Sequence, residues 1–237
     1  MAFDPQILAT LPMWLVAFLF SLTCHEAAHA LAAKLGGDLT AYYGGQVSLD
    51  PIPHIRRHPM GTIVVPILSF FINGGTWMIG WGSAPMDPHW AHRHPKRAAW
   101  MAAAGPAANL VLVLFTAGLI HVGLAAGWFS SPIRPSTTEI VMTAQGGKTI
   151  FTMFLSVVFT LNLLLATFNL MPVPPLDGHG VLGLLLPDDL ARKWAEWARD
   201  PMFQIAGFVL VWNGFAYVWG PIFRGALNLL YPGVVYG

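Results

Sequence analysis

The chain has 237 residues, of which 55% are hydrophobic and only 10% are charged. Soluble domains carry about 25% charged residues, so this composition excludes an ordinary soluble domain and indicates a membrane protein. The net charge of +1 gives no basis for nucleic-acid binding, and the single cysteine, Cys24, excludes a disulfide framework. No polar stretch is long enough to fold alone, so we expect one domain over residues 1–237.

The first apolar run, residues 7–35, is long enough to cross a bilayer, and we interpret it as a retained span and not as a signal peptide. Its sequence CHEAAH places His25 and His29 one helical turn apart, where both imidazoles can bind one metal ion. Glu26 lies one residue further round and can act on a water molecule without being a ligand. Ionisable residues inside a span are usually functional, so a metal site is favoured over core histidines.

The next two segments contain turn residues and basic clusters. Residues 37–58 are rich in Gly, Tyr, Thr and Val, and predict either a short β-hairpin at the membrane face or an irregular loop. A strand edge there, near residues 43–49, would pair with an extended peptide. Residues 61–83 contain FFINGGTW, whose paired glycines favour a re-entrant hairpin over a span. Re-entry keeps the basic clusters on both sides of this segment at the cytoplasmic face.

Residues 98–126 predict a spanning helix with a surface of small residues, AAAGPAANL, at which helices approach closely. Asn109 is a polar group at membrane depth and needs a partner. We predict that it binds substrate backbone, with a contact to a metal ligand or a helix-packing amide as the alternatives.

Residues 149–186 predict a helix broken at FNLMPVPPLDGHG, because prolines and a glycine prevent a regular helix. Among the eleven acidic residues, Asp177 is the one apart from Glu26 that apolar sequence encloses. A catalytic zinc site needs a third protein ligand, and either Asp177 or His179 fits that role. Asn169 and Pro175 lie beside the same break and are candidates for substrate binding.

The last apolar run, residues 202–231, contains WNGFAYVWGP, which divides it into two short helices in one interpretation. In total, we predict an all-α polytopic membrane protein with about five to six transmembrane segments, including the broken helix and the re-entrant hairpin, and with the short β-hairpin at the membrane face. The remaining histidines of the basic loops are interpreted as solvated, with a second metal site as the alternative: His54, His58, His89, His92 and His94.

Three motifs, HEAAH, AGPAANL and FNLMPVPPLDG, occur in this order within apolar segments. Together they resemble the site-2 protease family of intramembrane zinc metalloproteases, in its compact bacterial and archaeal branch without PDZ or CBS domains. The resemblance covers about residues 15–194. Gly82, Ser83 and Ala84 depart from the family pattern, which has a four-residue stretch with a lysine at this point.

The resemblance implies that His25, His29 and Asp177 bind one zinc ion per chain and that Glu26 activates a water molecule. It therefore favours Asp177 over His179 as the third ligand.

For the substrate, the resemblance implies that Asn169 and Pro175 help to seat an unwound helix. The expected partners are the lipid bilayer and membrane proteins with a transmembrane helix. The resemblance does not define the oligomeric state. The expected location is a prokaryotic cell membrane, with the active site nearer the cytoplasmic face. The alternative function is a non-catalytic zinc-binding membrane protein or a metal transporter.

Overall fold

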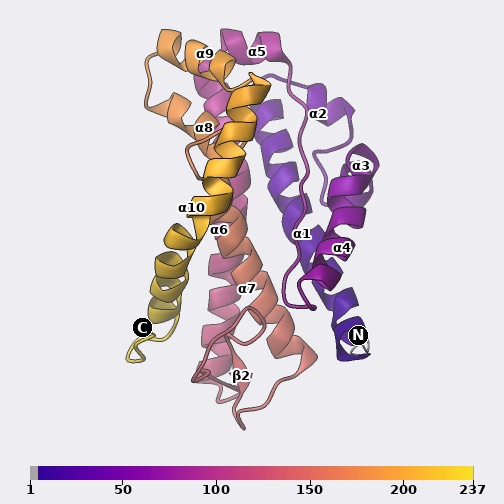
Figure 1. Cartoon of the computed structure of the whole chain (residues 1–237), viewed down its shortest axis with the longest axis vertical. Coiled ribbons are helices and arrows are strands. Elements are labelled where there is room, and N and C mark those ends of the chain that lie inside the picture. The colour runs from indigo at the N-terminus through magenta and orange to yellow at the C-terminus, as the bar shows by residue number, and fades with distance from the viewer. Residues whose placement is uncertain (1–4, 237) are drawn as a thin grey trace.

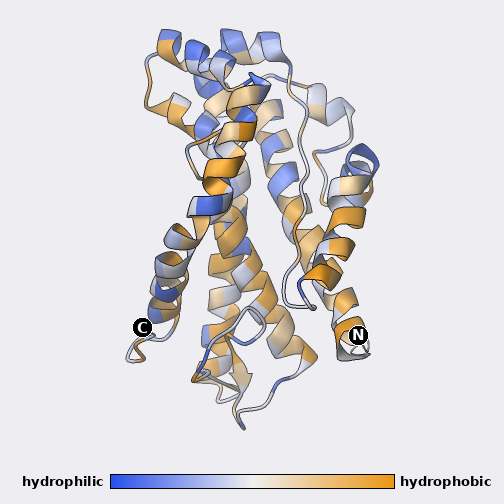
Figure 2. Ribbon diagram, viewed as in Figure 1, coloured by the Kyte–Doolittle hydropathy of each residue, from blue (hydrophilic) through white to orange (hydrophobic). Residues whose placement is uncertain are grey.

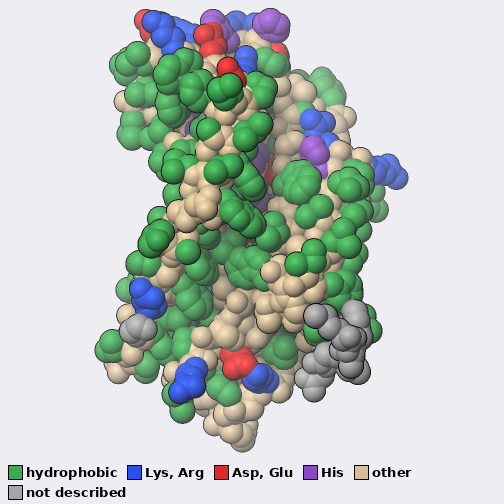
Figure 3. Space-filling view, in the orientation of Figure 1, with side chains coloured by type: hydrophobic (Ala, Val, Ile, Leu, Met, Phe, Trp, Pro, Cys, Tyr) green, Lys and Arg blue, Asp and Glu red, His purple; other side chains and the backbone are tan. Residues whose placement is uncertain are grey.

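Four long helices form the body of the protein in the computed structural model, which describes residues 5–236 (Figure 1). Each is long and apolar enough to cross a bilayer. Hydrophobic residues dominate the middle of the molecule, and charged side chains gather toward its two ends (Figure 2, Figure 3). The prediction of an all-α polytopic membrane protein is confirmed. The four helices are α1 (Pro5–Leu35), α6 (Pro95–Ala125), α7 (Ile150–Asn169) and α10 (Pro201–Leu230).

The core lies where α1, α6 and α7 meet, and α7 is the most buried of the four helices. Trp14 and Phe18 of α1 pack with Leu161 of α7 in one apolar cluster. A second cluster joins α6, α7 and the end of α10, and it includes Ile120 and Leu227. Helix α10 is the least buried, so most of its apolar surface faces outward, as expected of a lipid-exposed span.

The β-hairpin predicted for residues 37–58 is wrong, because two short helices occupy this segment: α2 (Thr40–Tyr43) and α3 (Pro51–Arg57). The local reason is a helix start. The Asp50 side chain accepts a hydrogen bond from the Ile52 amide at 2.9 Å, and Pro51 stands at the first helical position.

A pair of strands does exist, but it lies in the connection between α6 and α7. Strand β1 (Phe129–Ser130) pairs antiparallel with β2 (Met142–Thr143). This connection is at the opposite end of the molecule from α5 and α9 (Figure 1).

The segment predicted as a re-entrant hairpin, residues 61–83, reverses direction halfway. A π-helical turn, η1 (Met60–Val64), leads into α4 (Val65–Ile72), and the chain then turns at Gly74 and Gly75, both with positive φ. It returns as an extended limb, residues 76–87, to α5 (Pro88–Arg93) (Figure 1). The Trp81 amide donates to the Gly61 carbonyl at 3.0 Å, so the two limbs lie side by side.

The predicted break in residues 149–186 is present. Helix α7 ends at Asn169, and the proline-rich residues 170–176 lead to α8 (Asp177–Val181) and to a 3₁₀ turn, η2 (Leu182–Leu184). Gly178 allows the chain to close on itself, because a Cβ there would lie 2.3 Å from the carbonyl oxygens of Leu170 and Met171. Helix α9 (Asp188–Trp197) then lies beside α5 and connects to α10 (Figure 1).

The interpretation of residues 202–231 as two short helices is wrong, since α10 is continuous over Pro201–Leu230 and includes Pro221. A proline is tolerated inside a membrane helix where neighbouring groups satisfy the freed carbonyl. The end of α10 is fixed by Tyr231, whose hydroxyl donates to the Ile140 carbonyl at 2.6 Å. Its first half contacts the proline-rich break, because Gly207 faces the Pro174 carbonyl too closely for any Cβ.

Candidate metal centre

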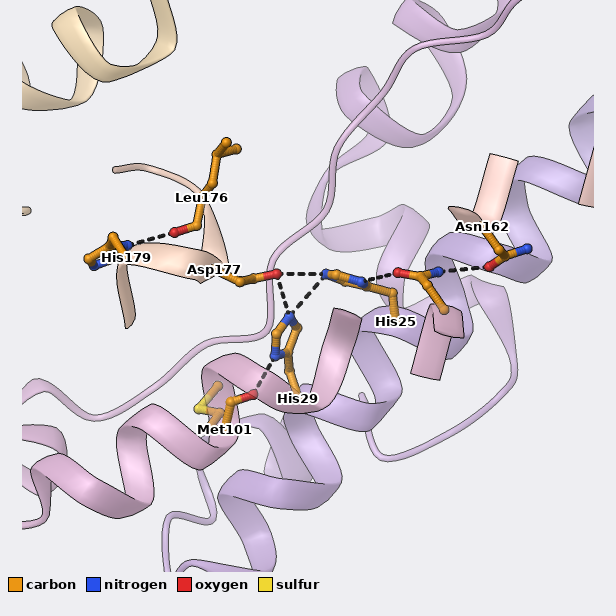
Figure 4. A network of polar contacts seen from close by, with 8 residues as sticks. His25, His29, Met101, Asn162, Leu176, Asp177 and His179 are labelled. Atoms are coloured by element: carbon orange, nitrogen blue, oxygen red, sulfur yellow. Dashed lines mark hydrogen bonds and ion pairs between the residues drawn. The ribbon is translucent and has the colours of Figure 1, made fainter. Parts of the chain in front are cut away.

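Two histidines of α1 and one aspartate of α8 converge on a single point inside the helix bundle (Figure 4). His25 Nε2 lies 3.0 Å from His29 Nε2, and Asp177 Oδ2 lies 3.2 Å and 3.3 Å from these two atoms. Both histidines are buried, at 5% and 6% exposure. The i, i+4 spacing on α1 and the helix break at the start of α8 bring these three side chains together, although about 150 residues of sequence separate the two halves.

The outer nitrogens of both imidazoles are held by groups of α6. His29 Nδ1 lies 2.7 Å from the Met101 carbonyl oxygen, and His25 Nδ1 lies 2.6 Å from Asn109 Oδ1. Such contacts orient metal-binding histidines and select the nitrogen that faces the metal.

The prediction that Asn109 binds substrate is wrong for this arrangement. Its side chain is fully buried, and both ends of its amide are occupied, by His25 and by Asn162. Asn109 therefore positions His25, which is the alternative role that the sequence left open.

Gly105 of α6 lets this helix approach the imidazole pair. A Cβ at this position would lie 2.3 Å from His29 Nε2 and 2.7 Å from His25 Cε1. The small-residue surface AAAGPAANL thus has a specific use, because its Gly105 makes room for the imidazole rings of His25 and His29.

We expect Gly105→Ala to lower metal affinity by at least about tenfold, the lower end of the cost of disturbing the surroundings of a ligand. The added methyl group must displace the His29 ring, which the Met101 carbonyl holds on its other side. Zinc titration against a competing chelator measures the change. Gly118→Ala on the same helix has no atom within 4 Å of its new Cβ and should bind zinc as the wild type does.

Asp177 stands at the first residue of α8, and Lys96 of α6 holds the other end of this segment. The Lys96 ammonium donates to the carbonyls of Gly183 and Leu184, both at 3.0 Å, and also to that of Leu186. These carbonyls end the helical segment and have no further helical partner, so one lysine satisfies three acceptors.

Replacing Lys96 with Met should destabilise the protein by about 2 to 4 kcal/mol, because several charge-assisted hydrogen bonds are lost and partly buried carbonyls remain unpaired. Thermal unfolding in detergent, followed by the loss of helical signal, measures the effect. The exposed Lys193 supplies the control. Lys193→Met should change the free energy of unfolding by no more than about 0.5 kcal/mol and leave the midpoint of thermal unfolding close to that of the wild type. Equal midpoints for Lys96→Met and Lys193→Met would contradict a stabilising role of the Lys96 hydrogen bonds.

His179 does not face the other ligands. Its ring points away from Asp177, and its Nδ1 lies 2.6 Å from the Leu176 carbonyl (Figure 4). Its own carbonyl accepts from the Trp194 indole at 2.8 Å, which ties α9 to α8. The geometry therefore favours Asp177 as the third ligand.

Glu26 lies beside the two histidines on α1 and is 4% exposed. Its Oε2 atom is buried and has no hydrogen-bond partner among the described residues. The extended limb passes directly over this carboxylate at Gly82, where a Cβ would lie 2.9 Å from Glu26 Oε1. An unpaired carboxylate in a buried site is available to accept a proton from a water molecule.

The converging atoms fit a bound metal ion. The Met101 carbonyl only accepts hydrogen bonds, so His29 Nδ1 carries the hydrogen, and in the neutral imidazole Nε2 then offers a lone pair. Asp177 Oδ2 is buried and accepts no hydrogen bond of suitable geometry. Two imidazole nitrogens and a carboxylate oxygen that face one point are typical of the ligands of a bound zinc ion. The observed separations of 3.0 to 3.3 Å match the spacing of about 3.3 Å between ligands of a tetrahedral zinc with bonds of about 2.0 Å.

The other candidates lie around this group. Asn169, at the end of α7, is partly buried and its side chain makes no hydrogen bond to another described residue. Pro175 is exposed on the break. Both positions allow contact with a bound peptide, and their roles in substrate binding stay predictions.

The loop histidines do not behave alike. His54 is 3% exposed and lies 3.1 Å from the Ser48 carbonyl, so the prediction that it is solvated is wrong. Its burial follows from the unexpected helix α3, which turns it inward. His58 contacts the Ser83 hydroxyl at 2.6 Å, and His92 lies 3.7 Å from Glu196. Within residues 5–236, no second group of three metal-binding side chains accompanies them.

His25 and His29 of α1 and Asp177 of α8 form a group that could hold a metal ion, and the chain has four helices long enough to span a bilayer. This combination is typical of the class of integral membrane metalloproteins. Residues 13–212 match the sequence profile of peptidase family M50, and the chain belongs to this family, the site-2 proteases. The resemblance noted in the sequence is thereby confirmed.

Curated relatives agree with this assignment. The chain is 30% identical over 190 residues to "Putative zinc metalloprotease YwhC" of Bacillus subtilis (strain 168), covering 80% of this chain and 76% of the relative. It is 29% identical over 197 residues to "Putative zinc metalloprotease Rip2" of Mycolicibacterium smegmatis, covering 83% of this chain and 66% of the relative. No solved structure matches the chain significantly.

Asn162, Lys96 and Met101 are residues of the site that the sequence did not single out. Asn162 carried a usable signal, because it is an amide in the middle of an apolar helix, as Asn109 is. Lys96 and the Met101 carbonyl carried none, since the first resembles any loop lysine and the second acts through its backbone.

Proposed function

We propose that the protein is a zinc-dependent intramembrane endopeptidase that cleaves peptide bonds in or near the transmembrane segment of other membrane proteins, as in regulated intramembrane proteolysis. The observation that carries the proposal is the convergence of His25, His29 and Asp177 beside the unpaired carboxylate of Glu26, within helices that can span a bilayer. Membership of peptidase family M50 and relatives named as zinc metalloproteases support it.

Zinc, when bound by His25, His29 and Asp177, supplies a Lewis acid that polarises a substrate carbonyl and makes water a better nucleophile. Glu26 takes a proton from the attacking water, whose oxygen adds to the carbonyl carbon. Glu26 then returns the proton to the amide nitrogen as the C–N bond breaks, so the products are a carboxylate and an amine. The burial of Glu26 keeps competing water away from this proton.

A helical substrate hides its carbonyls in its own i to i−4 hydrogen bonds and must unwind before it is attacked. The strand edge expected near residues 43–49 is absent, so it cannot hold the unwound peptide. The extended limb, residues 76–87, is better placed, because it passes Glu26 at Gly82. Its extended backbone suits pairing with a peptide, and Asn169 and Pro175 are proposed to contact the same peptide from the other side.

We propose that the site lies close to one membrane face. His29 is six residues before the end of α1 at Leu35, about 9 Å along the helix. Lys and Arg side chains gather at this end of the molecule, together with Asp and Glu (Figure 3). By the positive-inside rule this end is proposed to face the cytoplasm of a prokaryotic cell. The Lys and Arg residues at this end are Arg93, Lys96, Arg97, Arg192, Lys193 and Arg199.

Metal transport is less well supported. A transport path needs ligands at successive depths, whereas the described part of the chain holds one group of three at one depth. A non-catalytic zinc protein has no need of the buried, unpaired carboxylate of Glu26.

The proposal is tested with purified protein reconstituted in liposomes together with a single-span membrane protein. We expect cleavage by the zinc-loaded protein, loss of cleavage after removal of zinc by a chelator, and recovery when zinc is added back. Cleavage that continues unchanged in the chelator-treated, zinc-free protein would contradict a zinc-dependent mechanism.

A further inference from the structure

A chain of hydrogen bonds runs from His25 through three helices. Asn109 Oδ1 lies 2.6 Å from His25 Nδ1, and Asn109 Nδ2 lies 2.8 Å from Asn162 Oδ1 of α7 (Figure 4). Asn162 Nδ2 lies 2.8 Å from both Ser21 Oγ of α1 and the Val158 carbonyl oxygen. The side chains of Ser21, Asn109 and Asn162 are all 0% exposed, so water does not compete for these contacts.

The direction of every bond in this chain follows from its last acceptor. The Val158 carbonyl oxygen can only accept, so the Asn162 atom that faces it is the NH₂ group. The carbonyl of the Asn162 side chain must then face Asn109, whose own NH₂ group donates to it. The remaining oxygen of Asn109 faces His25 Nδ1 and accepts a hydrogen from it.

We propose that Asn162 is a positioning residue that acts through Asn109 to hold His25 with a hydrogen on Nδ1 and a free lone pair on Nε2. Without Asn162, the Asn109 amide can turn either end toward the imidazole. If its NH₂ group faced Nδ1, the hydrogen of a neutral ring would move to Nε2, which could not then bind a metal. The inference rests on the metal site proposed above, and it assigns the selection of the binding tautomer to α7.

The test compares zinc affinities by titration against a competing chelator. Asn162→Leu has a similar shape and no amide. We expect its zinc affinity to fall by about tenfold, the lower end of the cost of losing an outer partner of a ligand, because Asn162 acts through that partner, Asn109. Thr160→Val is the matched control, because Thr160 is a buried α7 residue whose hydroxyl has no partner among the described residues. It should bind zinc as the wild type does. Wild-type affinity in Asn162→Leu would overturn the proposal.

A double-mutant cycle distinguishes positioning from a general loss of structure. If Asn162 acts through Asn109, adding Asn162→Leu to Asn109→Leu should change zinc affinity by less than about twofold. Independent, multiplicative losses would overturn the proposal. The absorption spectrum of the cobalt-loaded Asn162→Leu variant should also differ from that of the wild type, whereas Thr160→Val should preserve it.

One measurement needs no variant, in case Asn162→Leu does not fold. Histidine-selective ¹⁵N NMR of the wild-type protein should show a protonated Nδ1 at His25 with and without zinc, and an unprotonated Nδ1 would overturn the proposal. Zinc bound elsewhere, or not bound by the wild type, would instead refute the metal site itself, so the two failures are distinguishable.

Discussion

Replacing Glu26 with Gln is expected to lower the rate of substrate cleavage by about 10²- to 10⁴-fold, the usual contribution of a general acid-base group. Gln keeps the size of the side chain but cannot take a proton from water at neutral pH. Glu26 is not one of the three converging ligands, so the zinc content of Glu26→Gln should equal that of the wild type. Co-expression with a membrane substrate, followed by quantification of the products and of bound zinc, measures both quantities.

Glu196 supplies the control for this substitution, because its side chain is 59% exposed and lies outside the site. Glu196→Gln should cleave the substrate at the wild-type rate. A Glu26→Gln protein that still holds zinc and cleaves normally would show that another group moves the proton.

Replacing Asp177 with Ala is expected to lower zinc affinity by more than about 100-fold. Losing an outer partner of a ligand costs up to about 100-fold, and losing the ligand itself should cost more. The substitution removes one of three protein ligands and leaves two imidazoles, which are 3.0 Å apart at their Nε2 atoms, to hold the ion. Cleavage should be lost together with zinc. Competition titration and metal analysis of the purified variant measure the effect.

His179→Ala is the informative comparison, since His179 is the other candidate ligand from the sequence. Its ring points away from the site, so this variant should bind zinc as the wild type does (Figure 4). Zinc retained by Asp177→Ala and lost by His179→Ala would reverse the assignment and require a different conformation of α8.

The features that the sequence predicts correctly are those that depend on residues close together in the chain. His25, Glu26 and His29 are readable because a helix places i and i+4 on one face and because a membrane span makes ionisable residues conspicuous. The break before Asp177 is readable because prolines exclude a regular helix. The paired glycines, Gly74 and Gly75, mark the reversal of residues 61–83 in the same way.

The remaining features depend on tertiary contacts that no local pattern encodes. Asn109 looked like a substrate contact because its partner on α7 is 53 positions away in the sequence. Residues 37–58 have the composition of strands, but the Asp50 cap and Pro51 start a helix, and α3 then buries His54. The prediction of strands depended on the content of β-branched and turn residues. Such a composition contains no information on a single capping hydrogen bond, which starts the helix here.

Intramembrane cleavage is tested by reconstituting a single-span membrane protein with the zinc-loaded wild-type protein and mapping the cleavage products by mass spectrometry. We expect new termini in or near the transmembrane segment with the wild-type protein, and about 10²- to 10⁴-fold less product with Glu26→Gln. Equal amounts of the same products from the wild type and from Glu26→Gln would contradict the claim, as would cuts confined to the soluble tails of the substrate.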